Sequence, residues 1–461
     1  MFRSTEPGAR AAGQLRRAGD NAVSRPGPAR ALAGIAAVAL TCGLAACSNS
    51  SASGGGSTGS IVFADVAPFS GPDAALGPTY LVSCQGTVNA MNKAGGVLGH
   101  KVSCTSADTK GDPADAVPAV GSLLSRTSNL ELVIGCTSDE AAAVVPVINS
   151  HKTVMFCMTG QSEFDHTHYP YFYRLVPPDL AESYAMTVIA QNLGYKRIAL
   201  AFGNDTGSQT FVQPAISAIA KAGLSLVANE TLDLNATTFR TEAEKIVLAH
   251  PDAIMTEALG SADPTLFAEI KQLNNGKMIP IIGTSAAISP AFYQASVKAV
   301  GGAATFTSNF HADNLVTATS GPAYDAFTQA LLAVKGKVAN AQTGNFTTYF
   351  TAPGAVHLYD GMNLAALAMI AAGSTDTAKW QPYIATIGDG VPGAVTVSSF
   401  AQGVRELKAG KKIRYVGPGG PTSFDSYHDS PGIFQIDTYT STGAVVVSGN
   451  ITAAQLRAVS G

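Results

Sequence analysis

Apolar runs alternate with stretches of helical periodicity along the chain from residue 60 onward. Residues 61–66 form a short apolar run of the kind that makes a buried parallel strand. Residues 77–91 have apolar positions at helical spacing, and the paired glycines Gly95 and Gly96 that follow favour a helix end. Residues 101–107 predict a second strand. Strand, helix and strand in this order predict a βαβ unit with a right-handed crossover.

The same alternation continues for most of the chain and predicts an α/β fold. Residues 130–136, 138–150 and 153–158 predict strand, helix and strand. A second series of strands is expected at residues 197–202, 224–229, 253–257 and 279–283, separated by helical segments. Two such series predict two doubly wound lobes, each with a parallel sheet.

Several short motifs occur in this framework in a specific order. The first strand ends in P-F-S-G-P (68–72), the first helix closes in N-K-A-G-G-V-L-G-H-K (92–101), and D-T-K-G-D-P (108–113) follows the second strand. These motifs resemble the branched-chain amino-acid (Leu/Ile/Val) type of type I periplasmic binding protein. Y-P-Y-F-Y-R (169–174), G-G-A-A-T-F (301–306) and P-T-S-F-D (421–425) resemble the segments beside that family's three crossovers, the second of them as a strand.

The resemblance implies an α/β fold of two doubly wound parallel-sheet lobes joined by a multi-strand hinge. Residues 60–177 and 308–416 are then expected to form the first lobe, and residues 178–307 and 417–461 the second. Ligands of doubly wound sheets bind outside the carboxyl ends of the strands, so two facing lobes predict a cleft.

The N-terminal segment has the layout of an export signal. A basic stretch (3–30) precedes a short apolar core (31–40), and L-A-A-C (44–47) resembles the bacterial lipobox. We therefore expect a signal peptide at residues 1–46, lipidation of Cys47 and a flexible tether at 47–59. The apolar run of about 17 residues is short for the alternative, a membrane-spanning helix of about 20 residues. The expected location is extracytoplasmic, with a lipid anchor in the cell membrane.

Export determines how the cysteines are interpreted. Four of them remain in the exported body: Cys84, Cys104, Cys136 and Cys157. An even number in an oxidising compartment implies two disulfides with three possible pairings. We expect the nearest pairing, Cys84 with Cys104 and Cys136 with Cys157. The alternative is four buried free thiols.

Charge and motifs argue against several classes of function. Without the leader's six arginines and two acids, the net charge falls from −3 to −7, which disfavours nucleic acid as a partner. No nucleophile elbow, phosphate-binding loop, zinc-protease helix or dinucleotide turn occurs, so we predict neither an enzyme nor a cofactor. His166 and His168 lack further ligands at metal spacing, so they are interpreted as surface histidines and no metal is predicted.

The expected ligand contacts of the first lobe lie mostly in loops that follow its strands: Phe69, Ser70, Ser138, Met158, Thr159, Gly160 and Tyr359. Thr137 and Glu140 form a capping box, which leaves the Ser138 hydroxyl beside free helix amides, a seat suited to a carboxylate. In the family resembled here, the loops of Ser138 and Thr159 hold the α-carboxylate of an amino acid. The alternatives are Ser138 as an ordinary first-turn residue and the Tyr359 region as a helix N-terminus.

In the second lobe the expected contacts are Thr206, Glu257 and Ser285. Relatives often carry an aromatic residue near Thr206, so threonine suggests a more polar or roomier pocket. The turn at 283–286 lacks the acid that commonly meets an ammonium group, and Glu257 is the only nearby acid that could replace it. Glu257 could equally be an ordinary loop carboxylate. The expected solute is therefore small and carboxylate-bearing: an amino acid, an amide or a short organic acid.

Two functions share these features. The first is solute capture for an ABC importer, with permease subunits in the membrane as partners and the chain as a monomer. The second is a ligand-sensing lipoprotein that signals to a membrane partner without transport. Neither composition nor motif separates them.

Overall fold

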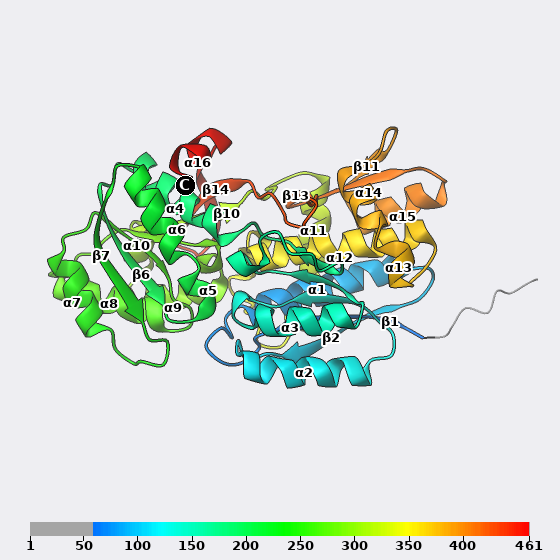
Figure 1. Cartoon of the computed structure of the whole chain (residues 1–461), viewed down its shortest axis with the longest axis horizontal. Coiled ribbons are helices and arrows are strands. Elements are labelled where there is room, and N and C mark those ends of the chain that lie inside the picture. The colour runs from blue at the N-terminus through cyan, green and yellow to red at the C-terminus, as the bar shows by residue number, and fades with distance from the viewer. Residues whose placement is uncertain (1–58, 461) are drawn as a thin grey trace, which may run out of the picture. The chain divides into compact units, whose positions relative to one another are not determined.

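The computed structural model describes residues 59–460, in which a parallel sheet and a larger, mainly parallel sheet are each covered by helices (Figure 1). The expected signal peptide, the lipidation site Cys47 and all but the last residue of the tether lie outside the described residues. The described residues belong to one compact unit.

The first lobe is built on a five-stranded parallel sheet with the order β2-β1-β3-β4-β5. Its strands are β1 (Ile61–Ala67), β2 (Val102–Asp108), β3 (Leu130–Gly135), β4 (Val154–Cys157) and β5 (Phe172–Arg174). Neighbouring residues of β1 enter different cores, Phe63 on one face and Ala64 on the other, and both are fully buried. A sheet covered on both faces therefore explains why these strands are continuous apolar runs.

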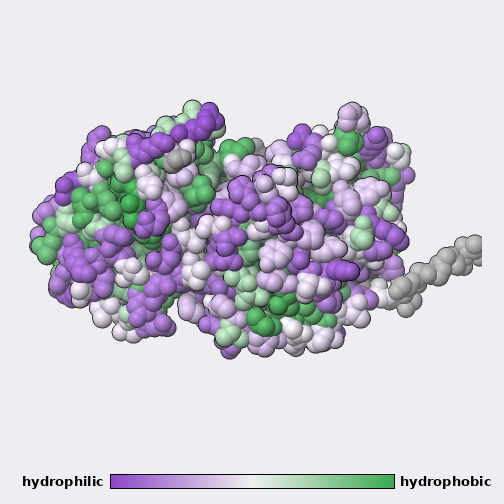
Figure 2. Space-filling model, viewed as in Figure 1, coloured by the Kyte–Doolittle hydropathy of each residue, from purple (hydrophilic) through white to green (hydrophobic). Residues whose placement is uncertain are grey.

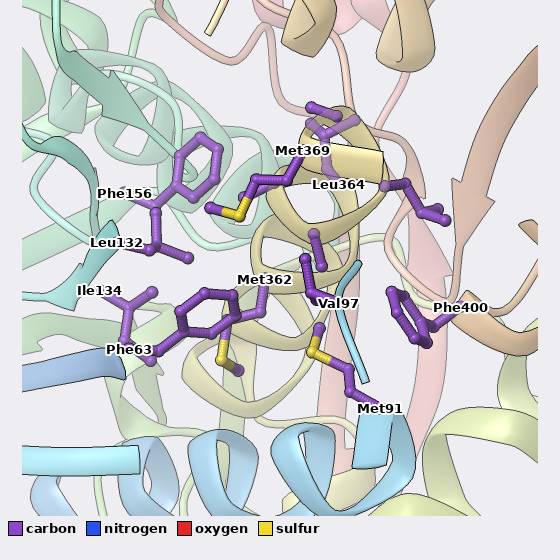
Figure 3. Close-up of a cluster of buried hydrophobic side chains, with 14 of the residues drawn as sticks. Phe63, Met91, Val97, Leu132, Ile134, Phe156, Met362, Leu364, Met369 and Phe400 are labelled. Carbon is purple, nitrogen blue, oxygen red and sulfur yellow. The ribbon is translucent and has the colours of Figure 1, made fainter. Parts of the chain in front are cut away.

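Helices cover both faces of this sheet. α1 (Gly77–Lys93) and α12 (Pro353–Ala372) pack on one face, while α2 (Pro113–Arg126) and α3 (Ser138–Ser150) pack on the other. Figure 3 shows Met362 and Met369 of α12 beside Phe63, Leu132 and Phe156 from the strands. α12 is long and apolar enough to span a membrane, but 78% of its apolar window is buried, as in the core helix of a globular lobe.

The chain from residue 322 to residue 421 packs around α12 and so rejoins the first lobe. Its elements are α11 (Pro322–Leu332), α13 (Thr377–Trp380), α14 (Tyr383–Asp389), β11 (Val395–Val397), α15 (Phe400–Lys408), β12 (Ile413–Gly417) and β13 (Gly420–Pro421). The last three strands form a small separate sheet with the order β11-β12-β13.

The second lobe contains a seven-stranded sheet with the order β15-β14-β10-β9-β8-β6-β7. Its strands are β6 (Arg197–Gly203), β7 (Ser225–Leu232), β8 (Ala253–Glu257), β9 (Ile281–Gly283), β10 (Phe310–Leu315), β14 (Phe434–Tyr439) and β15 (Val445–Asn450). Its helices are α4 (Asp179–Asn192), α5 (Thr206–Gln209), α6 (Val212–Lys221), α7 (Arg240–Leu248), α8 (Ala262–Leu273), α9 (Pro290–Val300), α10 (Ala303–Thr307) and α16 (Ala453–Val459). The strands β6 to β10 are parallel, and β14 and β15 add an antiparallel edge that the expectation of purely parallel lobes did not include.

The second crossover differs from the sequence-based expectation in two ways. The segment 301–306, expected to be a strand, is mostly the short helix α10, because Gly301 at φ 80° ends α9 and Phe306 packs on Phe310 with ring centroids 4.9 Å apart. The strand β10, expected in the first lobe, pairs with β9 of the second sheet. The chain therefore changes lobe after Leu315 and not before residue 308.

Both expected disulfides are present. Cys84 of α1 is bonded to Cys104 of β2, with a Cα–Cα distance of 6.1 Å. Cys136 is bonded to Cys157 of the neighbouring strand β4, with a Cα–Cα distance of 5.3 Å. The predicted pairing is confirmed, and both bridges lie in the first lobe.

The molecular face in Figure 2 mixes hydrophilic and hydrophobic residues, with an apolar area over α2. Val117 of α2 is 41% exposed, and further exposed apolar side chains lie elsewhere, such as Leu193 just after α4 and Leu332 at the end of α11. Single exposed apolar residues are ordinary on folded proteins, so these do not by themselves mark a docking surface.

Candidate ligand-binding cleft

A cavity of about 100 Å³ lies where loops that follow strands of both sheets meet. The first lobe contributes residues that follow β1, β3 and β4, and the second lobe contributes residues that follow β6, β8 and β9. Five expected contacts line this cavity: Ser138, Met158, Gly160, Glu257 and Ser285. The position at the carboxyl ends of the strands is the one expected for a doubly wound fold.

The N-terminus of α3 is organised as the capping box predicted it. The buried Glu140 carboxylate accepts the backbone N–H of Thr137 at 3.0 Å and also accepts the Thr137 hydroxyl. Thr137 is therefore occupied, and Ser138 Oγ lies 3.1 Å from Thr159 Oγ1. Two hydroxyls from different strand-end loops thus meet at the positive end of a helix. Thr159 itself is fully buried behind Ser138 and does not line the cavity.

Gly160 is small for a reason that the sequence did not reveal. A Cβ atom at Gly160 would lie 1.9 Å from Asp179 Oδ1, and the backbone N–H of Asp179 donates to the Gly160 carbonyl at 2.7 Å. Burial is the main cause that raises the pKa of Asp179 to about 8, partly opposed by a hydrogen bond from the Thr210 hydroxyl. The glycine therefore admits Asp179 of the second lobe to the cavity wall.

Three expected first-lobe contacts lie away from the cavity. The Ser70 hydroxyl donates to Asp108 Oδ2 at 2.6 Å, and Phe69 lines a separate neighbouring hollow. Tyr359 is only 2% exposed and packs on Phe327 with ring centroids 5.1 Å apart, inside the first lobe. The helix α12 begins at Pro353, so Tyr359 lies in its second turn and not at the helix N-terminus. The Tyr359 side chain is buried in the core and does not reach the cleft.

The second-lobe contacts differ in part from the expectation. The Thr206 side chain is exposed and does not line the cavity, and the following Gly207 donates its N–H to Asp139 Oδ1 at 2.8 Å. Glu257 lines the cavity and accepts the hydroxyl of Thr284. The Ser285 hydroxyl donates to Glu182 Oε1 at 2.9 Å.

The expectation that Glu257 is the only acid available in the second lobe is wrong. Glu182 lies within the first turn of α4, directly after the first crossover, and lines the same cavity. Burial raises the pKa of Glu182 to about 7 and that of Glu257 well above its ordinary value. The sequence does show an acidic first turn in the helix that follows Pro177 and Pro178, and Glu182 belongs to it. Whether the Glu182 side chain points into the cavity depends on how the two lobes pack, which the sequence does not show.

The sequence-based prediction also missed four aspartates in the cavity wall: Asp73, Asp139, Asp179 and Asp205. Burial first, and then the adjacent Asp139 carboxyl, raise the pKa of Asp73 to about 9. These residues are widely separated in sequence, so only the strand order brings them together.

Two α/β lobes that enclose a cavity at facing strand ends define a type I periplasmic binding protein. The chain belongs to the family described as "Periplasmic binding protein", whose profile matches residues 60–381. This family consists of extracytoplasmic binding proteins and not of enzymes.

Two curated relatives are Leu/Ile/Val-binding proteins. The chain is 28% identical over 191 residues to "Leu/Ile/Val-binding protein BraC3" of Rhizobium johnstonii. This alignment covers 39% of this chain and 51% of that protein. The chain is also 31% identical over 101 residues to "Leu/Ile/Val-binding protein homolog 3" of Brucella melitensis. This second alignment covers 22% of this chain and 27% of that protein. The chain thus spans about half or less of the length of these relatives.

Solved structures share the fold over nearly their whole length. A leucine-binding protein, LivK, of Thermotoga maritima has a TM-score of 0.65 at 18% identity, covering 86% of this chain and 99% of that chain. LivJ of Streptococcus pneumoniae in complex with isoleucine has a TM-score of 0.67 at 18% identity, covering 85% and 100%. A solute-binding protein of R. palustris in complex with benzoate has a TM-score of 0.65 at 16% identity, covering 85% and 96%. At these identities the similarity establishes the fold alone.

Proposed function

We propose that this chain is a lipid-anchored binding protein that captures a small solute bearing a carboxylate and an amino group, and delivers it to an ABC importer. The observation that carries the proposal is the meeting of the Ser138 and Thr159 hydroxyls, 3.1 Å apart, at the N-terminus of α3. Hydroxyl donors and the helix dipole at one point favour a carboxylate.

The opposite wall supports an amino group on the same solute. Glu257 and Glu182 of the second lobe both line the cavity, and each accepts a hydroxyl from a neighbouring residue. Neither carboxyl takes part in an ion pair among the described residues, so both are suited to an ammonium group of the solute. Among the solutes expected from the sequence, an amino acid is therefore favoured over a short organic acid or an amide.

The cavity's size and protonation bear on how such a solute binds. The cavity of about 100 Å³ is small, so the lobes must move apart to admit a solute of the size of an amino acid. Asp179, which adjoins Gly160, has a pKa of about 8 because it is buried, so it is mostly neutral at pH 7. A neutral Asp179 adds no like charge against a solute carboxylate at Ser138.

A thermal-shift screen of the purified protein against amino acids, short organic acids, amides and sugars tests this proposal. We expect amino acids to raise the melting temperature. Ser138→Ala should weaken their binding by roughly ten- to a hundredfold, because a hydrogen bond to a charged group contributes about 1.5–3 kcal/mol. Thr159→Ala should weaken it less, because Thr159 does not line the cavity and acts through its contact with Ser138. Ser150→Ala, on the exposed end of α3, serves as the control. Hits confined to sugars, unchanged in the two cavity variants, would show that the proposed carboxylate seat is wrong.

A further inference from the structure

The side chains that line the cavity carry acids without any balancing base. Among the described residues, the lining has six carboxylic acids and no lysine, arginine or histidine: Asp73, Asp139, Asp179, Glu182, Asp205 and Glu257. An α-ammonium group offers one positive charge to this wall. An amino acid with a neutral side chain would thus bring a single positive charge to six carboxylic acids.

The internal partners of these acids are neutral. Asp139 and Asp205 accept backbone N–H groups at 2.8 and 2.7 Å, and Glu182 accepts the Ser285 hydroxyl at 2.9 Å. None of the ion pairs formed within residues 59–460 includes a carboxylate of the lining. Burial of these groups is thus not offset by a charge of the protein itself.

Arg174 is a buried cation that acts on this wall, and each of its nitrogens already binds another group. Arg174 lowers the pKa of Asp179 from a distance, but its Nε binds Asp429 at 2.6 Å and its Nη2 binds Asp165 at 2.7 Å. Its Nη1 donates to the carbonyl of Gln161 at 3.1 Å. Each of its three nitrogens thus binds another group, and Arg174 is not among the residues that line the cavity.

Asp73 supplies an independent sign of a missing partner. The residue is 2% exposed and lines the cavity, and its carboxyl is hydrogen-bonded to that of Asp139, yet its Oδ1 atom has no N–H or hydroxyl partner among the described residues. Buried polar atoms in native proteins are almost always paired, so an orphan in a cavity wall points to a group that the ligand brings. No group of three or more His, Cys, Asp or Glu within residues 59–460 is arranged to hold a metal ion, so an organic cation fits better.

The acids form two groups according to their lobe. Asp73 and Asp139 follow the adjacent strands β1 and β3 of the first sheet, whereas Glu182 and Glu257 accept the hydroxyls of the consecutive residues Ser285 and Thr284 in the second lobe. Asp205 lies between them and acts on both Asp73 and Glu257. Resting on the function proposed above, we propose that the solute carries two separate ammonium groups, one at Glu182 and Glu257 and a second at Asp73 and Asp139. Diamino acids and short aliphatic diamines share this chemistry.

The proposal fixes a direction of pH dependence. Asp73 is faced by Asp139, Glu140 and Asp205 and by the Tyr80 phenol, with no base among them. Burial and these neighbours raise its pKa to about 9, so an arriving ammonium group displaces a proton. Affinity for a dication should therefore rise with pH, by up to about tenfold per pH unit for each proton displaced. A neutral solute that accepts hydrogen bonds from protonated carboxyls would show the opposite trend.

Calorimetric titration of the purified protein with L-lysine, L-norleucine and cadaverine, at about pH 6 and about pH 8.5, tests the proposal. Norleucine has the carbon chain of lysine without the second amine, and cadaverine lacks the carboxylate. We expect lysine to bind at least about tenfold more tightly than norleucine at the higher pH, and the difference to shrink at the lower pH.

Each other outcome has a distinct meaning. Equal or tighter binding of norleucine would overturn the second cation site and leave the proposed function intact. Tight cadaverine with weak lysine would support the two cation sites and contradict the carboxylate seat. No binding of any amine or amino acid would contradict both.

A matched pair of variants locates the second cation site. Asp73→Asn should weaken lysine binding about tenfold and leave norleucine binding unchanged. Asp115→Asn makes the same substitution on α2, where the side chain is 49% exposed and pairs with Lys110, and should change neither. Unchanged lysine binding in a folded Asp73→Asn protein would contradict the assignment. If that variant does not fold, the comparison of lysine with norleucine in the unaltered protein decides.

Discussion

Asp139 of the first lobe accepts the backbone N–H of Gly207 of the second lobe at 2.8 Å. The contact joins the N-terminal ends of α3 and α5 beside the cavity, and a Cβ atom at Gly207 would lie 3.1 Å from the Ser138 Cβ atom. A side chain that lines the cavity therefore also links the two lobes. We therefore expect ligand binding and lobe contact to be coupled through Asp139.

The link between the lobes can be tested by removing the acceptor. Asp139→Ala loses a charge-assisted hydrogen bond of about 1.5–3 kcal/mol, so we expect solute affinity to fall by roughly ten- to a hundredfold. Asp139→Asn keeps an acceptor oxygen and should retain more of the affinity for a monocationic amino acid. Titration calorimetry provides the measurement, and equal affinities for Asp139→Ala and the unaltered protein would show that this contact is dispensable.

The disulfides should stabilise the first lobe. They close segments with sequence separations of 20 and 21 residues. A loop of this length predicts about 3 kcal/mol of unfolding free energy for each bond. Chemical denaturation of Cys84→Ala/Cys104→Ala and of Cys136→Ala/Cys157→Ala proteins measures the loss. Peptide mapping without reduction should recover both linked pairs, and alkylation of all four thiols in the native protein would contradict the pairing.

Stability without ligand should fall as the pH rises. An aspartate with an ordinary pKa of 3.8 when unfolded and about 9 when folded binds its proton more tightly in the folded state. Its contribution is complete below the unfolded pKa and is lost progressively as the pH rises toward the folded pKa. Asp73→Asn should therefore flatten the decline of melting temperature between about pH 5 and about pH 9. Other buried acids keep part of the slope, and an unchanged slope in Asp73→Asn would contradict the assigned pKa.

The lipid anchor is a prediction from the N-terminal sequence, which lies outside the described residues. If Cys47 carries the lipid, Cys47→Ala should release the protein from membranes while solute binding persists. Fractionation of cells that express each form, followed by a binding assay on the soluble fraction, provides the measurement. Retention of the Cys47→Ala protein in the membrane would contradict lipidation at Cys47 as the membrane anchor.

The fold followed from the sequence because its signals are local. The strand β1, the helix α1 and the capping box at Thr137 and Glu140 each depend on neighbouring residues. The disulfide partners were also predictable, because each pair lies on elements that adjoin in a βαβ order. The position of β10 was not, since a strand beside a crossover can join either sheet without a change in its own pattern.

The site was only partly predictable because its chemistry is not local. Ser138, Met158 and Gly160 follow predicted strands and could be expected at the cleft. Asp73 and Glu182 reach the same cavity from a loop and from a helix, and no spacing in the sequence connects them. Tyr359 was misplaced because α12 begins at Pro353, so the start of the helix lines the cavity and Tyr359 lies in the second turn, within the core.

Hydrogen–deuterium exchange of the protein, with and without the solute that raises its melting temperature most, tests the central claim most directly. The account predicts that solute slows exchange at both walls of the cavity, near Ser138 to Gly160 in the first lobe and near Gly207, Glu257 and Ser285 in the second. The amides of α2 and α7, which do not line the cavity, should keep their rates. Protection confined to one lobe, or protection elsewhere with both walls unchanged, would contradict capture of the solute between the lobes.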